Sequence, residues 1–474
     1  MRVRPLTVAL DMPRQYRSAV LWAVRHAANA FGIPVEVWAD GSGGPPDIVH
    51  SSSGLSEPLR WWPFNPRCYD GDGEFAAREF DGHMIWTDGS PLTDLVGGIF
   101  RLLTFRDEAT VDPGERNELG VFNTPALPPA RRAVLQRPLV EHHLDALWAR
   151  LHQVRPDLQQ RPRWPNAKRW ACVLTHDTDA VSLGTPRELL YNAAKLVVRR
   201  DRRRVAMLRA GVRHRGKPMT DPYFGFPVWR SLEEEWGIRS AFYAFVRPKE
   251  IKRHMHDSRS AVTDRGVDRG PLREMADAGW EFGLHASIRA RQHPDGLRRS
   301  REMLEEILAR PVPGLRHHYW AIDWVAPWRT FRQHAEAGFA YDTSIAWRDV
   351  PGFRAGSSLP FRPFDVDAGA PISLWELPTA IQDGHLLERS DPERAVEDAI
   401  RIIDEVRSRG GALVLNWHTE SATSRFERAG YREALERLLE LIWDRSDAWV
   451  TTPSRLLEHW QERENHADRQ DVDL

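Results

Sequence analysis

The stretch Ala171–Asp179 reads ACVLTHDTD, an apolar run followed at once by a threonine, a histidine and two aspartates. A short apolar run with a polar end is typical of a buried strand. Two carboxylates two residues apart at a strand end can divide labour, one binding a cation while the other stays free as a base. Because aspartate is also common in ordinary turns, a purely structural reading of Asp177 and Asp179 stays open at this point.

Outward from this stretch, the chain repeats one pattern, in which a helical segment ends at glycine and a short apolar strand follows. Four such units are LEEEWG before IRSAFYAFV, REMADAG before WEFGLH, RQHAEAG before FAYDTS, and EVRSRGG before ALVLNWH. Glycine just past a helix tolerates the left-handed conformation that stops it. Strands that alternate with helices predict a parallel sheet covered by helices, so the fold class is α/β.

Polar side chains gather at the carboxyl end of each predicted strand. After Asp177 and Asp179 these are His285, Arg316, His317, His318, Asp342, Glu376 and His418. In a (β/α) barrel such ends converge on one mouth, where catalytic groups lie. The sequence therefore predicts one site built from several strand ends.

The residue types at these ends suit a divalent metal and acid–base chemistry. Imidazole and carboxylate ligands, such as His285 and the aspartates, are those that zinc and similar cations take. Arg316 cannot bind a cation, but it can hold a carboxylate in its ionised form. Alternation along a strand predicts that one of His317 and His318 points into the mouth and the other away. His418 suits the protonation of a leaving group near neutral pH.

The order of these motifs resembles the NodB-type polysaccharide deacetylases of carbohydrate esterase family four. The motifs are Asp-x-Asp, GLHAS, RHHYW, YDTS, LWELP and LNWH, and the resemblance covers about residues 170–460. It is similar in particular to the branch with THDxD in place of TFDDG, which is often encoded with surface-polysaccharide genes and has an accessory N-terminal region. The resemblance implies a distorted (β/α)7 barrel that hydrolyses the N-acetyl group of a saccharide and releases acetate.

The resemblance also implies a role for individual residues. Asp177 matches the general base, Asp179 the metal-binding carboxylate, His285 the first metal-binding histidine, Arg316 the arginine that tethers the base, and His418 the general acid. The family's second metal-binding histidine falls on Arg289 in this chain. We expect His318 to replace it, with His317 and His293 as weaker candidates, and we expect the divalent metal to be zinc.

The chain of 474 residues divides by pattern into two parts. Residues 1–165 predict a smaller accessory α/β domain, in which helical periodicity runs from Thr93 to Leu151, and residues 166–474 predict the barrel. The boundary lies in Gln159–Lys168, which holds two prolines and little that could pack. A strongly basic segment, residues 197–217, predicts a solvated helix or loop, or a site for a phosphate or acidic saccharide.

Composition excludes several classes of function. The net charge of −1 favours neither nucleic acid nor an anionic membrane as a global partner, so the expected partner is an N-acetylated saccharide. No apolar run is long enough to span a membrane, and no signal peptide is evident, so we expect a cytoplasmic protein. Cys68 and Cys172 are predicted to form no disulfide. The sequence does not specify an oligomeric state.

Two other functions fit part of the pattern. VLTHDTDAV also matches the DxDx(T/V) motif of haloacid-dehalogenase-like phosphatases, with Asp177 as nucleophile and Asp179 as acid/base. That family also needs a downstream lysine and an acidic pair, which have no clear counterparts here. The second alternative is a non-catalytic sugar-binding barrel, suggested by Arg289 and by 20 tryptophans.

Overall fold

A computed structural model describes residues 4–39, 45–53, 60–90, 93–264, 266–388 and 391–468. Its main sheet has nine strands, eight of them in the order β14-β11-β10-β9-β8-β7-β16-β15, with β17 also paired to β7. All pairs in this sheet are parallel. The strands are β7 (Trp170–Thr178), β8 (Ala241–Val246), β9 (Glu281–Ala286), β10 (Gly314–His317), β11 (Tyr341–Asp342), β14 (Trp375–Glu376), β15 (Ile381–Gln382), β16 (Ala412–Asn416) and β17 (Ala448–Thr451). The predicted α/β class is confirmed.

The stretch 375–382 curls this sheet toward a barrel. Its first part, β14, pairs with β11, and its second part, β15, pairs with β16 at the other end of the strand order. Between them, the Leu377 N–H donates to the Asp342 carbonyl and the Ala380 N–H to the Val414 carbonyl. One bent segment thus joins both edges, and the result is a distorted (β/α) barrel, as the resemblance implied.

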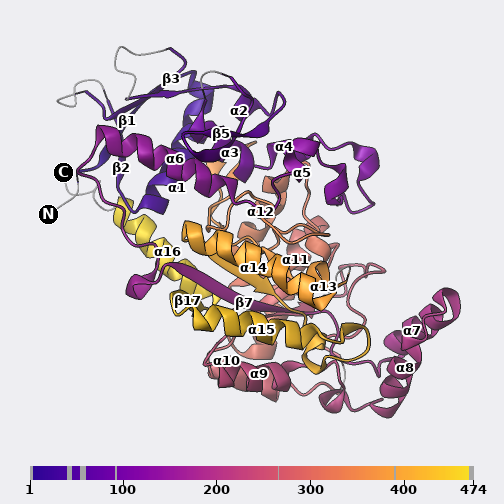
Figure 1. Ribbon diagram of the computed structural model, residues 1–474. Helices are drawn as coiled ribbons and strands as arrows, with labels where there is room; N and C mark the ends of the chain where they lie inside the picture. Colours follow the sequence, from indigo (N-terminus) through magenta and orange to yellow (C-terminus); the bar gives the residue numbers. More distant parts are fainter. Residues whose placement is uncertain are drawn as a thin grey trace.

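Helices cover the outside of the sheet, and one pair departs from it (Figure 1). The covering helices are α9 (Phe226–Glu235), α10 (Gly270–Asp277), α11 (Pro294–Leu308), α12 (Pro327–Glu336), α14 (Pro392–Arg409), α15 (Tyr431–Asp444) and α16 (Pro453–Asp468), with the short α13 (Asp383–Leu387) beside β15. The pair α7 (Pro186–Arg199) and α8 (Arg203–Arg213) follows β7 and extends away from the barrel (Figure 1). It contains the basic segment 197–217.

The N-terminal part has a sheet of its own. Strands β1 (Leu6–Asp11), β2 (Val35–Val37), β3 (Ile48–Ser51) and β4 (Trp61–Pro63) form a parallel sheet in the order β2-β1-β3-β4. An antiparallel hairpin, β5 (Ala76–Phe80) and β6 (His83–Thr87), contacts helix α6 (Leu139–Val154), where the Trp86 N–H donates to His143. The helices are α1 (Arg17–Phe31), α2 (Arg67–Asp70), α3 (Leu95–Leu103), α4 (Arg106–Ala109), α5 (Pro129–Arg132) and α6. The predicted small α/β unit and its helices within 93–151 are present.

This N-terminal part packs tightly on the barrel. One hydrophobic core cluster contains residues of both, such as Ile99 and Leu359. The turn 352–358 of the barrel part is held by buried polar contacts, because Glu108 of α4 pairs with Arg354 and Glu141 of α6 accepts from Ser358. The boundary at 165/166 stays a prediction, and the expectation that its linker has little to pack was wrong. Trp164 is buried there, with its ring 5.3 Å from that of Trp460 on α16.

The two cysteines are buried and unpaired, as predicted. Among the described residues, no helix is long and apolar enough to cross a membrane. The cytoplasmic location stays a prediction.

Candidate active site

The end of β7 divides its side chains between the barrel mouth and the helix layer. Asp177 and Asp179 line a cavity at the mouth. His176 lies on the other face, where its Nδ1 is 2.8 Å from the Trp417 carbonyl and its Nε2 2.9 Å from Glu233 of α9. This is the alternation expected of a strand, and it sends the two aspartates to the same place.

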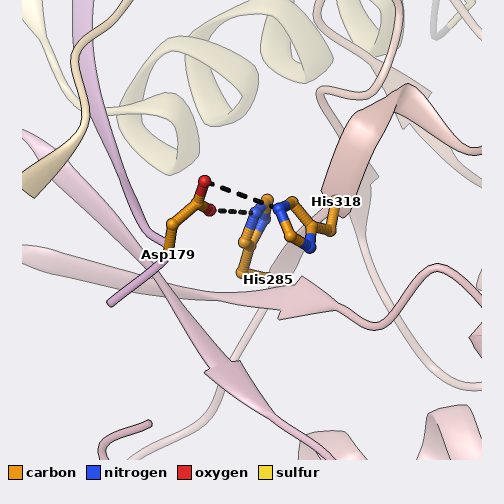
Figure 2. Close-up of side chains that lie close together, drawn as sticks. All are labelled: Asp179, His285 and His318. Carbon is orange, nitrogen blue, oxygen red and sulfur yellow. Dashed lines mark hydrogen bonds and ion pairs between the residues drawn. The ribbon is translucent and has the colours of Figure 1, made fainter. Parts of the chain in front are cut away.

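Asp179 lies against two imidazoles from neighbouring strands (Figure 2). Its Oδ1 is 3.1 Å from His285 Nε2, and its Oδ2 is 3.5 Å from His318 Nε2. One potential ligand atom from each of the three residues lies within 4.8 Å of the others. Two histidines and one carboxylate form a common three-ligand set of catalytic zinc. These donors therefore fit a divalent cation, and their role as ligands stays a prediction.

The second nitrogen of His285 is also held. Its Nδ1 is 3.1 Å from the carbonyl oxygen of Arg316, on the paired position of β10. Because a carbonyl can only accept, Nδ1 carries a proton there, and Nε2, which faces Asp179, is the nitrogen that would bind a cation. This is the arrangement in which an imidazole binds a metal best.

His318 reaches the cluster from a turn with unusual backbone geometry. Directly after β10, Tyr319 and Trp320 have φ of 60° and 53°, in the left-handed region that bulky residues seldom adopt. Both residues line the cavity. Strain of this kind persists where the surrounding structure enforces it, often at functional sites. His317, one residue earlier, turns its Nε2 to His334 of α12 at 2.9 Å, although the residue also borders the cavity.

Asp177 is held at both carboxylate oxygens. Arg316 Nη1 donates to Oδ1 at 2.8 Å, and Asn416 Nδ2 donates to Oδ2 at 2.8 Å. Burial alone would raise the pKa of Asp177, but the positive charges of Arg316, His285 and His418 lower it below its ordinary value. Asp177 is thus an ionised carboxylate fixed in orientation next to the histidine–aspartate cluster.

His418 faces Asp179 from the far side of the cavity. Its Nε2 is 3.4 Å from Asp179 Oδ2, and its Nδ1 is 2.6 Å from Asp383 Oδ1. Burial opposes a charged imidazole, but the two carboxylates raise the pKa of His418 well above its ordinary value. Asp383 is itself ionised, since His418 and Arg428 overcome the effect of burial and lower its pKa. His418 is therefore a protonated imidazole whose Nε2 is directed into the cavity.

The cavity around these groups has a volume of about 280 Å³. Its lining is mostly polar and includes two arginines, Arg348 and Arg428, and the aromatic rings of Tyr319 and Trp320. Arg289 and His293 are not among the described residues that line it. The structure thus brings together Asp177, Asp179, His285, Arg316, His318 and His418, the six residues given a role in catalysis or metal binding. Asp342 and Glu376, which the strand ends also placed at the mouth, are not among the described residues that line the cavity. Asp342 Oδ2 lies 2.8 Å from His334 Nδ1, and Glu376 accepts from the Ile345 N–H.

Three residues at the site were missed by sequence reasoning: Asn416, Asp383 and Arg428. Asn416 stands two residues before His418 at the end of β16, so alternation could have placed both on the mouth side. Asp383 follows β15, a strand of two residues with little apolar signal. Arg428 donates to Asp383 at 3.3 Å from a loop, for which the sequence carries no comparable pattern.

Two of the solved structures matched to part of this chain carry the name polysaccharide deacetylase. A protein from Mycobacterium smegmatis assigned as a polysaccharide deacetylase is 22% identical over 64% of this chain and 93% of its own, with a TM-score of 0.42. One from Pseudomonas aeruginosa PAO1 with the same assignment is 15% identical over 64% and 94%, with a TM-score of 0.42. The Puue allantoinase is also 15% identical over 64% and 94%, with a TM-score of 0.41.

No protein-family model matches the chain, and no curated protein is significantly similar to it. Any function has to come from the side chains at the mouth.

Proposed function

We propose that this chain is a metal-dependent hydrolase that removes N-acetyl groups from an amino-sugar-containing oligo- or polysaccharide. The observation that carries the proposal is the presence, in one cavity, of a carboxylate–bis-imidazole cluster, a separately held carboxylate and an imidazole whose Nδ1 is held by the Asp383 carboxylate. Amide hydrolysis needs these three elements, because water must be activated, the carbonyl polarised and the departing amine protonated.

Asp179, His285 and His318 would hold the divalent metal, and zinc suits these ligands best. When bound, such a cation polarises a carbonyl and lowers the pKa of bound water. Asp177 would accept the proton of the attacking water, and Arg316 and Asn416 keep its carboxylate aimed. His418 would donate a proton from Nε2 to the amine nitrogen as the carbon–nitrogen bond breaks, while Asp383 holds the ring at Nδ1. The products are acetate and a free amino sugar.

The residues around Asp179 disfavour the phosphatase alternative. That chemistry needs a downstream lysine and an acidic pair for magnesium, whereas Asp179 meets three imidazoles, those of His285, His318 and His418. The distorted barrel and the imidazoles around Asp179 have no role in that chemistry. The non-catalytic alternative is separated from our proposal by experiment.

The decisive experiment measures metal and acetate together. The full chain is stripped with a chelator, reloaded with Zn²⁺ or Co²⁺, and assayed for acetate release from N-acetylated chitooligosaccharides and for phosphate release from p-nitrophenyl phosphate. We expect about one metal per chain, a Co²⁺ absorption band typical of nitrogen and oxygen ligands, and metal-dependent acetate release. Metal and saccharide binding without acetate release would support the non-catalytic barrel, and phosphate release would support the phosphatase.

A further inference from the structure

The helical hairpin α7–α8 has no part in the site chemistry, although it begins a few residues after Asp179. It projects from the barrel (Figure 1) and is largely separate from the main core. A small apolar cluster of its own, with Leu183 and Met207, lies at its base. The hairpin is anchored there by ion pairs from Glu188 to Arg259 and from Arg204 to Glu427.

The outer surface of the hairpin carries exposed apolar side chains. Of the eight large hydrophobic residues that the described part of the chain exposes, four are here: Leu190, Val197, Val198 and Val212, which are 65–79% exposed. Leu190, Val197 and Val198 are seven and eight residues apart on α7 and therefore share one face of the helix. Exposed aliphatic clusters are unfavourable in water and mark a surface that binds something apolar.

The same hairpin is strongly basic. Residues 186–217 contain 11 lysines and arginines but only two acidic residues, Glu188 and Asp201. Both acids are already paired, Glu188 with Arg259 and Asp201 with Arg203 and Arg204. Most of the exposed cations form no ion pair with any described residue, namely Arg187, Arg199, Arg200, Arg202, Arg209, Arg213, Arg215 and Lys217. Their charge is therefore available to an anionic partner.

We propose that the α7–α8 hairpin binds the surface of an anionic lipid membrane. Basic residues beside exposed aliphatic ones are the composition of helices that lie in the membrane interface, with the apolar side chains among the lipids and the cations at the headgroups. A nucleic acid or an acidic polysaccharide would neutralise the charge but leave Leu190, Val197 and Val198 in water. A second copy of the chain would bring two like-charged hairpins together.

Membrane binding by the hairpin would place the barrel mouth near the lipid surface. α7 starts just after the loop that carries Asp179, and its Tyr191 ring is 3.7 Å from Arg259. Met255, in the connection after β8, is also exposed and adds an apolar side chain on the mouth side. A saccharide carried on a lipid would then be presented to the cavity. This consequence for the substrate rests on the proposed function, whereas membrane binding itself does not.

The test is co-sedimentation of the full chain with vesicles of phosphatidylcholine alone or of phosphatidylcholine mixed with phosphatidylglycerol. We expect binding to the anionic vesicles only, weakened by rising salt. Arg199→Gln/Arg200→Gln/Arg202→Gln should lower the partition coefficient on the order of 10²-fold, because each cation near an anionic surface contributes. The matched control for charge is Arg298→Gln/Arg299→Gln on α11, which should bind as the parent does.

The apolar contribution is tested in the same way. Val197→Ser/Val198→Ser should weaken vesicle binding roughly tenfold or more, since two aliphatic side chains lose their burial in lipid. Val37→Ser/Trp443→Ser, at exposed apolar positions elsewhere, is the matched control and should not. Acetate release from a soluble chitooligosaccharide should be the same in all these variants, so failure of the hairpin proposal is distinguishable from failure of the proposed function.

Three results would overturn the membrane proposal. The first is equal binding, or no binding, to neutral and anionic vesicles. The second is that the chain binds duplex DNA or an acidic polysaccharide but does not bind vesicles, and that Val197→Ser/Val198→Ser does not change this binding. The third is a dimer in solution that this variant dissociates, which would make the apolar face a contact between copies of the chain.

Discussion

Asp177 and Asp179 are two residues apart, yet their surroundings suit them to different tasks. Hydrogen bonds from Arg316 and Asn416 fix both oxygens of Asp177. Asp179 meets only imidazoles at comparable distances, those of His285, His318 and His418. Burial opposes its charge, but these rings, His318 first, lower its pKa well below the ordinary value. A cation could replace imidazole protons at Asp179, whereas at Asp177 it would have to displace Arg316.

This difference predicts separate effects for two amide substitutions. Asp177→Asn should lose acetate release by at least 10²-fold and keep bound metal, because an amide cannot take the proton of water. Asp179→Asn should lose the metal, measured by elemental analysis after dialysis, because an amide is a weaker ligand than a carboxylate. Loss of metal from Asp177→Asn alone would mean that the two roles are reversed.

His418 is predicted to act as an acid, with Asp383 positioning it. His418→Ala should stay folded, keep its metal and release acetate from an N-acetylated saccharide about 10²- to 10⁴-fold more slowly. Much of this loss should disappear with p-nitrophenyl acetate, since its leaving group departs without protonation. Asp383→Asn should show the same selective loss in a weaker form. Equal losses on amide and ester substrates would indicate a structural role for both residues.

At the scale of elements, the sequence predicted most of what places the site. The apolar runs correctly indicated β7, β9, β10 and β16. Glycines such as Gly410, which has a φ of 65°, end the helices before strands, as expected. His317 and His318 point to different partners, but His318 lies beyond the end of β10, so strand alternation alone does not account for the difference. The closing segment 375–382 was only half predicted, because its two short pairings depend on contacts with β11 and β16 far along the chain. For that reason Asp383 was missed.

The ion pair between α4 and the turn 352–358 is an element-scale contact that the sequence did not suggest. Arg354 Nη2 is 2.7 Å from Glu108 Oε2, and both side chains are almost fully buried. The guanidinium also lies 3.1 Å from the centre of the Trp324 ring. A buried pair of this kind ties the N-terminal part to the barrel, although desolvation offsets much of its electrostatic attraction.

Glu108→Gln should therefore lower the free energy of unfolding by about 3 kcal/mol, because it leaves the Arg354 charge buried without a partner. The double variant Glu108→Leu/Arg354→Met should lose less, since it buries no charge. Chemical denaturation of the parent, Glu108→Leu, Arg354→Met and the double variant gives the coupling energy. Additive losses would show that the two residues do not depend on each other.

At the scale of the whole molecule, the two predicted domains share one core and several buried polar contacts. Composition marked a boundary near residue 165, but it could not show that Trp164 packs against α16 or that turn 352–358 carries partners for α4 and α6. These contacts join residues hundreds of positions apart, and only the folded chain defines them. The N-terminal part thus stabilises turn 352–358 of the barrel part.

The stability gained from these contacts depends on pH, because it involves Glu141 of α6. Its Oε1 accepts from the Ser358 N–H at 2.7 Å and from the Ser358 hydroxyl at 2.6 Å, and its side chain is fully buried. Burial raises the pKa of Glu141 from 4.5 to about 7, even though the bonds from Ser358 oppose the rise. The folded chain therefore binds a proton here that the unfolded chain has already released between these two values.

The free energy of unfolding should consequently fall as the pH rises from about 4.5 to about 7. At higher pH, Glu141 should contribute little further change. The loss is on the order of 3 kcal/mol at most, at about 1.4 kcal/mol per pKa unit. The measurement is the difference in free energy of unfolding between the parent and Glu141→Gln across this range, because the amide cannot titrate and other groups cancel. We expect the parent to lose stability relative to Glu141→Gln as the pH rises, with the exposed Glu306→Gln as a control for the loss of one carboxylate. A difference that does not change with pH would show that folding leaves the pKa of Glu141 at its ordinary value, because the bonds from Ser358 offset its burial.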